Sequence, residues 1–259
     1  MKTVLIILLA QAFLFAQKVN EKNGQNFTGS QFSIFIEPLH FQNVEALLSG
    51  KRNSGIGLNI APQWQFGNSE EAHTIYLAMG IAFASTSVQG DEGSFFPYLK
   101  LQYEYEHKIF KTSHSDLFIG GFAKADYRMA RYPAWDDSHG YWADFFGIGL
   151  ISKFEAPMDE ERLWYVEAQL PVAGYNNRPQ SVRNYKMDDP SVGGIIKLAH
   201  KDLKFAAFKK YFNPSFEFGI DLNSSLKTLY YKVEYLYAEA SYSKPYKQIN
   251  HCIGAGVNF

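Results

Sequence analysis

The sequence predicts an all-β protein, a closed antiparallel up-and-down transmembrane β-barrel of 12 strands, with 10 strands as the alternative. Three observations predict this fold. Apolar and polar residues alternate along most of the chain after residue 30. The alternating segments run to about 9–13 residues, long enough to cross a bilayer at a tilt, whereas strands of soluble proteins average about 5–6. Aromatic residues, which make up 17% of the chain, gather at the ends of these segments, as at Trp64, Phe66 and Trp164.

The first 16 residues are predicted to be a secretory signal peptide. Lys2 precedes an apolar run from Val4 to Phe15 that only Gln11 interrupts, and Ala16 follows the run. This run is too short to span a bilayer of ~30 Å as a helix, which needs about 20 residues. The predicted organisation is therefore a signal peptide over residues 1–16 and one barrel domain over residues 17–259.

The alternation is clearest between His73 and Ser85, where one face carries only large apolar side chains. Alternation alone does not say which face is inside. A soluble sandwich or a lipocalin-like barrel buries the apolar face, whereas a membrane barrel turns that face to lipid. Segment length, the Gly, Ala and charged residues of the polar face, and the position of the aromatics favour a lipid-facing apolar side. A β-structure in lipid must close on itself to pair its backbone polar groups.

Ten strands are predicted over residues 31–39, 54–66, 73–85, 95–107, 116–129, 141–154, 162–172, 215–222, 226–241 and 248–259. Single-chain bacterial barrels have an even strand number. Residues 191–212 therefore supply either two further strands, 191–200 and 203–212, or none, and the count of 12 is favoured.

A periplasmic amino terminus would place the longer loops outside the cell. The predicted external loops are 40–53, 86–94, 130–140, 173–190 and 242–247. The predicted periplasmic turns are 67–71, 112–115, 155–161 and 223–225.

The last predicted strand, 248–259, closes with the segment from His251 to Phe259 and so ends the sequence on an aromatic residue. It resembles the C-terminal insertion signal of Gram-negative outer-membrane barrels. The resemblance implies a location in the cell outer membrane and recognition of Phe259 by the barrel-assembly machinery. The segment from Trp164 to Pro171, followed by Arg178-Pro179, also resembles barrels of Bacteroidota-type bacteria and implies no activity.

Charge and motifs narrow the expected partners. With 25 basic and 26 acidic side chains the chain lacks the Lys/Arg surplus of a nucleic-acid-binding protein. The seven histidines show no spacing suited to zinc, and no phosphate-binding or dinucleotide motif is present, so no metal and no cofactor are expected. The expected partners are outer-membrane lipid, lipopolysaccharide and the assembly machinery.

A set of charged residues is predicted to face the barrel interior. Its members are Lys100, Glu104, Glu106, Lys124, Asp126, Arg128, Lys153, Glu167, Glu217, Asp221, Lys232 and Glu234. A barrel of this size has a narrow interior in which unpaired charges keep their desolvation cost, so opposite charges should pair. Two hypotheses follow: a salt-bridged plug, or a slim channel for small polar solutes selected by these charges. Acidic members outnumber basic ones, so such a channel should favour cations.

Three functions are compatible with this fold. The favoured hypothesis is a non-catalytic outer-membrane barrel that acts as a structural protein or a narrow pore. The second is a lipid-modifying enzyme, an acyl hydrolase or transferase, with Asp137, Ser138 and His139 at the external rim. These are the parts of an activated nucleophile, but consecutive side chains rarely assemble into one, so the sequence leans against an enzyme. The third is an adhesin or partner scaffold that uses the loop 173–190.

Overall fold

The structure is a computed structural model. It describes residues 29–45, 51–86, 94–112, 114–131, 140–142, 144–159, 162–177, 191–201, 203–222, 226–239 and 245–259. The predicted signal peptide lies outside the described residues, so its processing stays a prediction.

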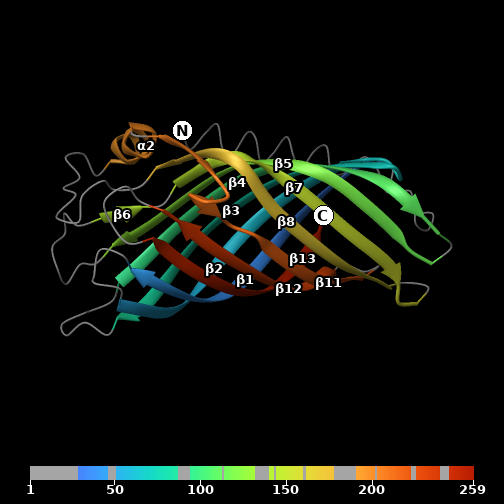
Figure 1. The fold of residues 1–259 in the computed structure, drawn as a ribbon. Helices are drawn as coiled ribbons and strands as arrows, with labels where there is room; N and C mark the ends of the chain where they lie inside the picture. The colour runs from blue at the N-terminus through green and yellow to red at the C-terminus, as the bar shows by residue number, and fades with distance from the viewer. Residues whose placement is uncertain are drawn as a thin grey trace.

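Ten of the described strands form a closed antiparallel ring, in the order β1-β2-β3-β4-β5-β7-β8-β11-β12-β13 (Figure 1). Their bounds are β1 Gly29–Glu45, β2 Lys51–Gly67, β3 Glu71–Thr86, β4 Ser94–Lys111, β5 Asp116–Arg131, β7 Asp144–Pro157, β8 Arg162–Asn177, β11 Ser215–Leu222, β12 Leu226–Ala238 and β13 Tyr246–Asn258. The last strand closes the ring because it pairs with β12 on one side and with β1 on the other, where Phe35 lies opposite Gly256. Among the described strands, each strand of the ring therefore has a paired neighbour on both sides.

The favoured count of 12 strands was wrong, and the alternative of 10 is confirmed. Residues 192–201 form the helix α2 (Val192–Lys201) instead of a strand. Ser191 caps this helix, since its Oγ accepts a hydrogen bond of 3.1 Å from the backbone N–H of Gly194.

The other predicted extra strand, 203–212, is interrupted by a turn. It consists of β9 (Lys204–Ala207) and β10 (Tyr211–Phe212), with the N–H of Lys210 bonded to the carbonyl of Ala207 at 2.7 Å between them. β9 extends the sheet beside the end of β8 and β10 beside the end of β12. The short strand β6 (Gly140–Trp142) pairs with β5. β9 and β10 extend the wall beyond the short strand β11, and none of the three pieces adds a strand to the ring.

The strands also run further than predicted at one end of the barrel. β1 continues to Glu45 and β2 begins at Lys51, so most of the predicted loop 40–53 is strand. β8 likewise extends to Asn177, so residues 173–177 of the predicted loop 173–190 are strand, and residues 178–190 lie outside the described residues. The predicted turns at the other end are short; at one of them the N–H of Asn68 bonds to the carbonyl of Glu71 at 2.8 Å.

The apolar face of the wall is on the outside, and the polar face is on the inside. On β2, Ile56 is 70% exposed and Ile60 50%, whereas Asn59 between them is 7% exposed. On β4, Leu101 is 49% exposed and its neighbour Gln102 only 1%. The apolar face is therefore not buried in a core, as it would be in a soluble sandwich or a lipocalin-like barrel. No helix among the described residues is long and apolar enough to cross a membrane.

Aromatic rings line the outer wall near the short-turn end. Phe66 stacks on His73 with ring centroids 4.9 Å apart, and His73 Nδ1 lies 2.8 Å from the hydroxyl of Tyr103. Further around the wall, the rings of Phe154 and Trp164 are 5.3 Å apart. Such rings suit the border of an apolar layer because they combine an apolar body with polar atoms.

Candidate functional site: the charged interior of the barrel

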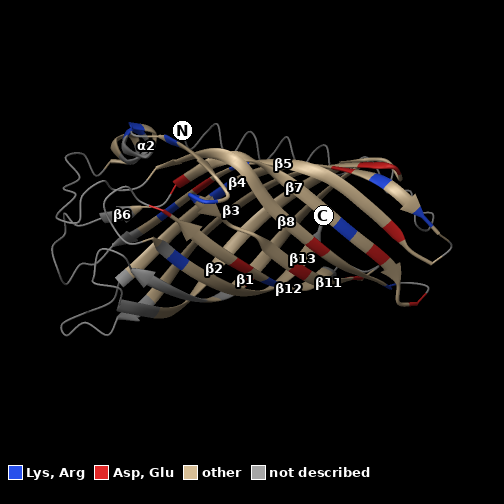
Figure 2. Ribbon diagram, in the orientation of Figure 1, with Lys and Arg blue, Asp and Glu red and all other residues tan. Residues whose placement is uncertain are grey.

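All twelve residues of the predicted interior set occupy inward positions of six ring strands, β4, β5, β7, β8, β11 and β12. Figure 2 shows that basic and acidic residues lie close together along these strands. Their inward direction follows from the strand period, since the alternate positions on the same strands carry the exposed apolar side chains.

Arg128 on β5 anchors the first cluster. Its guanidinium donates hydrogen bonds to both carboxylate oxygens of Asp126, at 3.0 and 2.8 Å, and to Glu234 Oε1 on β12 at 2.8 Å. The second oxygen of Glu234 accepts a bond of 2.9 Å from the side-chain amide of Asn250. The guanidinium also lies 5.2 Å from the ring centre of Tyr98. The Arg128 guanidinium thus joins β5 to its neighbour β4 and to β12, which is not a neighbour of β5 in the ring.

Lys124 on β5 contacts the segment after α2 that contains β9 and β10. Its Nζ donates to Asn213 Oδ1 at 2.6 Å and lies 4.0 Å from Asp126. Nearby, the rings of Phe145 and Tyr211 stack almost parallel with centroids 3.8 Å apart. Residues 211–213 therefore contribute side chains to the interior as well as backbone to the wall.

Two buried amides connect β4 with β8. The Gln102 amide donates to Gln169 Oε1 at 2.9 Å, and the Gln169 amide donates to Glu104 and to Glu167, both at 2.8 Å. Because β5 and β7 stand between β4 and β8 in the ring, these bonds bridge the interior. The carboxyl groups of Glu104 and Glu167 are held by neutral donors here.

A further carboxyl group, Glu37 on β1, receives three neutral donors. Tyr76 donates to Glu37 Oε1 at 2.8 Å, Tyr230 donates to the same oxygen, and the Asn59 amide donates to Glu37 Oε2 at 3.2 Å. Lys100 Nζ lies 5.2 Å from the ring centre of Tyr76. This cluster ties β1 to β2, β3 and β12.

Several other interior charges form pairs toward the short-turn end, whereas one carboxylate oxygen of Glu106 is buried without a hydrogen-bond partner. Lys232 lies 3.1 Å from Glu217, and Tyr165 donates to the other oxygen of Glu217 at 2.6 Å. Lys153 lies 2.6 Å from Glu155. Thr228 donates to Asp221, and Lys108 lies 2.7 Å from Asp116.

Solvent hardly reaches the middle of this network. Lys100 and Glu106 are each 5% exposed, and Gln102 and Asp126 are each 1% exposed. Aromatic rings fill the space between the charges, and some pack against glycines of the neighbouring strand. A Cβ on Gly219 would lie 2.4 Å from the Tyr165 ring. The interior is therefore packed by polar and aromatic side chains, as in the side-chain-filled small barrels.

Several residues of the interior network lie outside the predicted charged set. Glu37, Gln102, Gln169, Tyr230 and Asn213 all join the network, although none belongs to the predicted set. That set was built from neighbouring charged positions, and four of these residues are uncharged. The strand period places such residues on the inward face: Gln102 of β4 lies on the same face as Lys100 and Glu104. Including uncharged inward positions would have added them to the set.

The other predicted sites can be placed only in part. Asp137, Ser138 and His139 lie outside the described residues, as do residues 178–190 of the proposed binding loop, so both hypotheses stay predictions. Phe259 is described: its side chain is 53% exposed, and its N–H donates to the carbonyl of Phe32 at 3.0 Å. Among the described residues no group of three or more His, Cys, Asp or Glu could hold a metal ion.

The fold and the interior together define a ten-stranded β-barrel with an apolar exterior and a packed, charged interior. No protein-family model and no curated protein matches the sequence. Solved structures resemble it in fold at low identity.

One is the outer membrane protease OmpT from Escherichia coli, at 8% identity and a TM-score of 0.46, covering 94% of this chain and 99% of that one. An outer membrane channel from Pseudomonas putida F1 has 8% identity and a TM-score of 0.44, covering 93% and 100%. The β-domain of the Bordetella autotransporter BrkA has 11% identity and a TM-score of 0.42, covering 88% and 100%.

Proposed function

We propose that this protein is an integral barrel of the bacterial outer membrane whose interior is closed by a plug of side chains, so that it serves the cell envelope as a non-conducting structural barrel. The plug is defined as the interior network around Arg128, Glu234, Gln102, Gln169 and Glu37. The contrary hypothesis is an open narrow pore for small polar solutes.

The membrane location is supported by the exterior of the wall. Side chains such as Ile56, Phe83 and Ile253 are 70%, 56% and 66% exposed, and in water an apolar surface of this extent would drive aggregation. Most ring strands have 13–18 residues, enough to cross the ~30 Å hydrocarbon layer at a tilt. The apolar outer surface is suited to contact with lipid, and lipopolysaccharide would contact the external end of the barrel.

The closed state is supported by one observation above all, the bonds that bridge the interior. Arg128 reaches Glu234, and Gln102 reaches Gln169, from strands that are not neighbours in the ring. A conducting path needs a continuous water-filled channel. Gln102 and Asp126, at the middle of the barrel, are each only 1% exposed, so no water-filled channel runs past them.

Two experiments test the two parts of the proposal. Recovery of the protein in carbonate-washed outer membranes, with heat-modifiable migration on gels, is the expected result for a membrane barrel; recovery in the soluble periplasm would overturn it. Planar bilayers containing the purified wild-type barrel should then carry no steady current. A stable ohmic conductance would overturn the plug and restore the pore hypothesis.

A further inference from the structure

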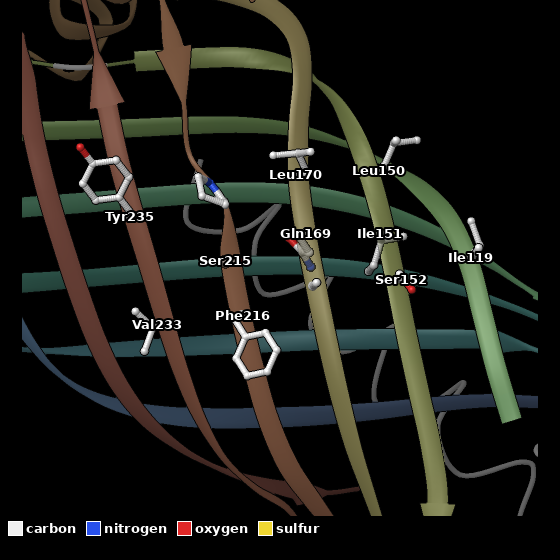
Figure 3. A pocket seen from close by; sticks show the side chains of 12 residues that line it. Ile119, Leu150, Ile151, Ser152, Gln169, Leu170, Ser215, Phe216, Val233 and Tyr235 are labelled. Atoms are coloured by element: carbon white, nitrogen blue, oxygen red, sulfur yellow. The ribbon is translucent and has the colours of Figure 1, made fainter. Parts of the chain in front are cut away.

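A recess of about 610 Å³ lies in the outer wall, crossing β5, β7, β8, β11 and β12 (Figure 3). Its floor is formed by two small residues, Ser152 and Ala168, which lie opposite each other on β7 and β8. Larger side chains flank them in the same row of the sheet: Ile119 beside Ser152, and Phe216 beside Ala168. Ile119 and Phe216 are 45% and 51% exposed, so the recess faces outward.

The next row of the wall closes one end of the recess. Leu150 and Leu170 lie opposite each other there, and Leu150 is 57% exposed. Val233 and Tyr235 on β12 complete the rim beyond Phe216. None of the described residues that line the recess is charged.

An interruption of the sheet lies in the same place. The pairing of β8 with β11 ends at Gln169, opposite Ser215, and pairing on that side of β8 resumes only at Ala173, opposite Ala207 of β9. Pro171 and Pro214 stand in the gap, and a proline has no N–H to donate to a ladder. The chain detours around the gap through residues 208–214, which leaves the outer surface hollow at this point.

We propose that this recess is a binding site for one acyl chain of a membrane lipid. This inference rests on the membrane location proposed above. The recess is continuous with the lipid-facing surface, since its rim residues belong to the same outward rows as the rest of the apolar wall. Its volume lies within the ~300–1,000 Å³ of small-molecule sites, and its lining suits a ligand without polar groups.

A flexible hydrocarbon chain also fits the shape better than a second copy of the barrel would. Atoms that line an empty apolar hollow lose their dispersion contacts, and a chain one methylene wide can enter it to restore them. A second convex barrel would rest on the protruding Leu150 and Phe216 and would leave the floor at Ser152 and Ala168 uncovered.

The test compares the wild type with Ala168→Phe, which fills the floor, and with Ala123→Phe as matched control. Ala123 is an exposed alanine of the same outer wall, opposite Tyr103 and Ile148, and does not line the recess. Each folded barrel is delipidated, supplied with dipalmitoyl phosphatidylethanolamine and released from micelles for native mass spectrometry. Ser152→Leu is a second filling variant in case Ala168→Phe does not fold.

The expected result is one retained lipid on the wild type and on Ala123→Phe, with about tenfold weaker retention on the filled variants. Equal retention by all variants would overturn the inference. So would a wild-type dimer that Ala168→Phe dissociates, since it would make a second copy the occupant. Membrane fractionation distinguishes failure of this proposal from failure of the membrane location. A soluble protein refutes the membrane location. A membrane barrel whose lipid retention is unchanged by Ala168→Phe and Ser152→Leu refutes this binding site alone.

Discussion

Arg128 on β5 and Glu234 on β12 meet across the interior of the barrel, with 2.8 Å between the guanidinium nitrogen and the carboxylate oxygen. The two strands are separated by three others on the shorter way around the ring. Both side chains are largely buried, at 8% and 12% exposure. Asp126 shares the same guanidinium, so removal of Arg128 would break both ion pairs and leave Asp126 with only the more distant Lys124, at 4.0 Å.

Arg128→Ala should therefore destabilise the barrel by about 3–5 kcal/mol, the usual cost of breaking a buried ion pair by removing one partner. Urea unfolding in detergent, followed by loss of the compact form on gels, measures this change. Arg162→Ala is the control, because Arg162 pairs with Asp159 at an exposed turn. That variant should lose no more than ~1 kcal/mol. Equal losses would show that the interior pair contributes no more than a surface pair.

Gln102→Gly combined with Gln169→Gly should open a conducting path. The double variant removes the amides that bridge β4 and β8 and leaves Glu104 and Glu167 facing an enlarged interior. We expect steady current in planar bilayers, with reversal potentials that favour cations because acidic side chains line the opening. Each single variant leaves one amide in place and should conduct less. A silent double variant would mean that other parts of the plug close the barrel alone.

The sequence was sufficient to predict the wall but not the plug. Alternation distinguishes the two faces of a strand, and segment length together with the positions of the aromatic residues indicates which face is inside, so the inward direction of Lys100 or Glu217 could be predicted. Which strand lies across from which depends on the stagger of the closed ring, and no local pattern encodes it. The pairing of Gln102 with Gln169 and the convergence of Tyr76 and Tyr230 on Glu37 were therefore beyond prediction.

The strand count failed for a more local reason. Val192, Ile195, Ile196 and Ala199 recur at helical spacing, and Ser191 precedes them as a cap, whereas the favoured count of 12 requires a strand over residues 191–200. Parity then required a second strand over 203–212. The turn at residues 208–210, which no glycine or proline marks, divides that segment instead.

Gly256→Ala tests how tightly the interior is packed. A Cβ at this position would lie 2.3 Å from the ring of Phe35 on the neighbouring strand. The ring would have to move, and we expect a loss of about 1–3 kcal/mol in the free energy of unfolding. Phe35→Leu should relieve part of that loss, so the two changes should be non-additive. Gly193→Ala is the control: its Cβ would come no closer than 3.8 Å to another atom, and stability should not fall. Additive effects at Gly256 and Phe35 would contradict the proposed contact.

Deletion of Phe259 separates assembly from stability. The ring of this residue is 53% exposed and contacts Phe32 at 6.2 Å between centroids, so its loss should cost the finished barrel little. If the assembly machinery recognises the terminal aromatic, the yield of heat-modifiable barrel in cells should fall severalfold, while refolding of the purified chain in detergent stays close to wild type. Phe32→Ala is the matched variant, because it removes the same ring contact and keeps the terminal aromatic. If Phe32→Ala lowers the cellular yield as much as the deletion does, packing accounts for the effect and the role of Phe259 as an assembly signal is refuted.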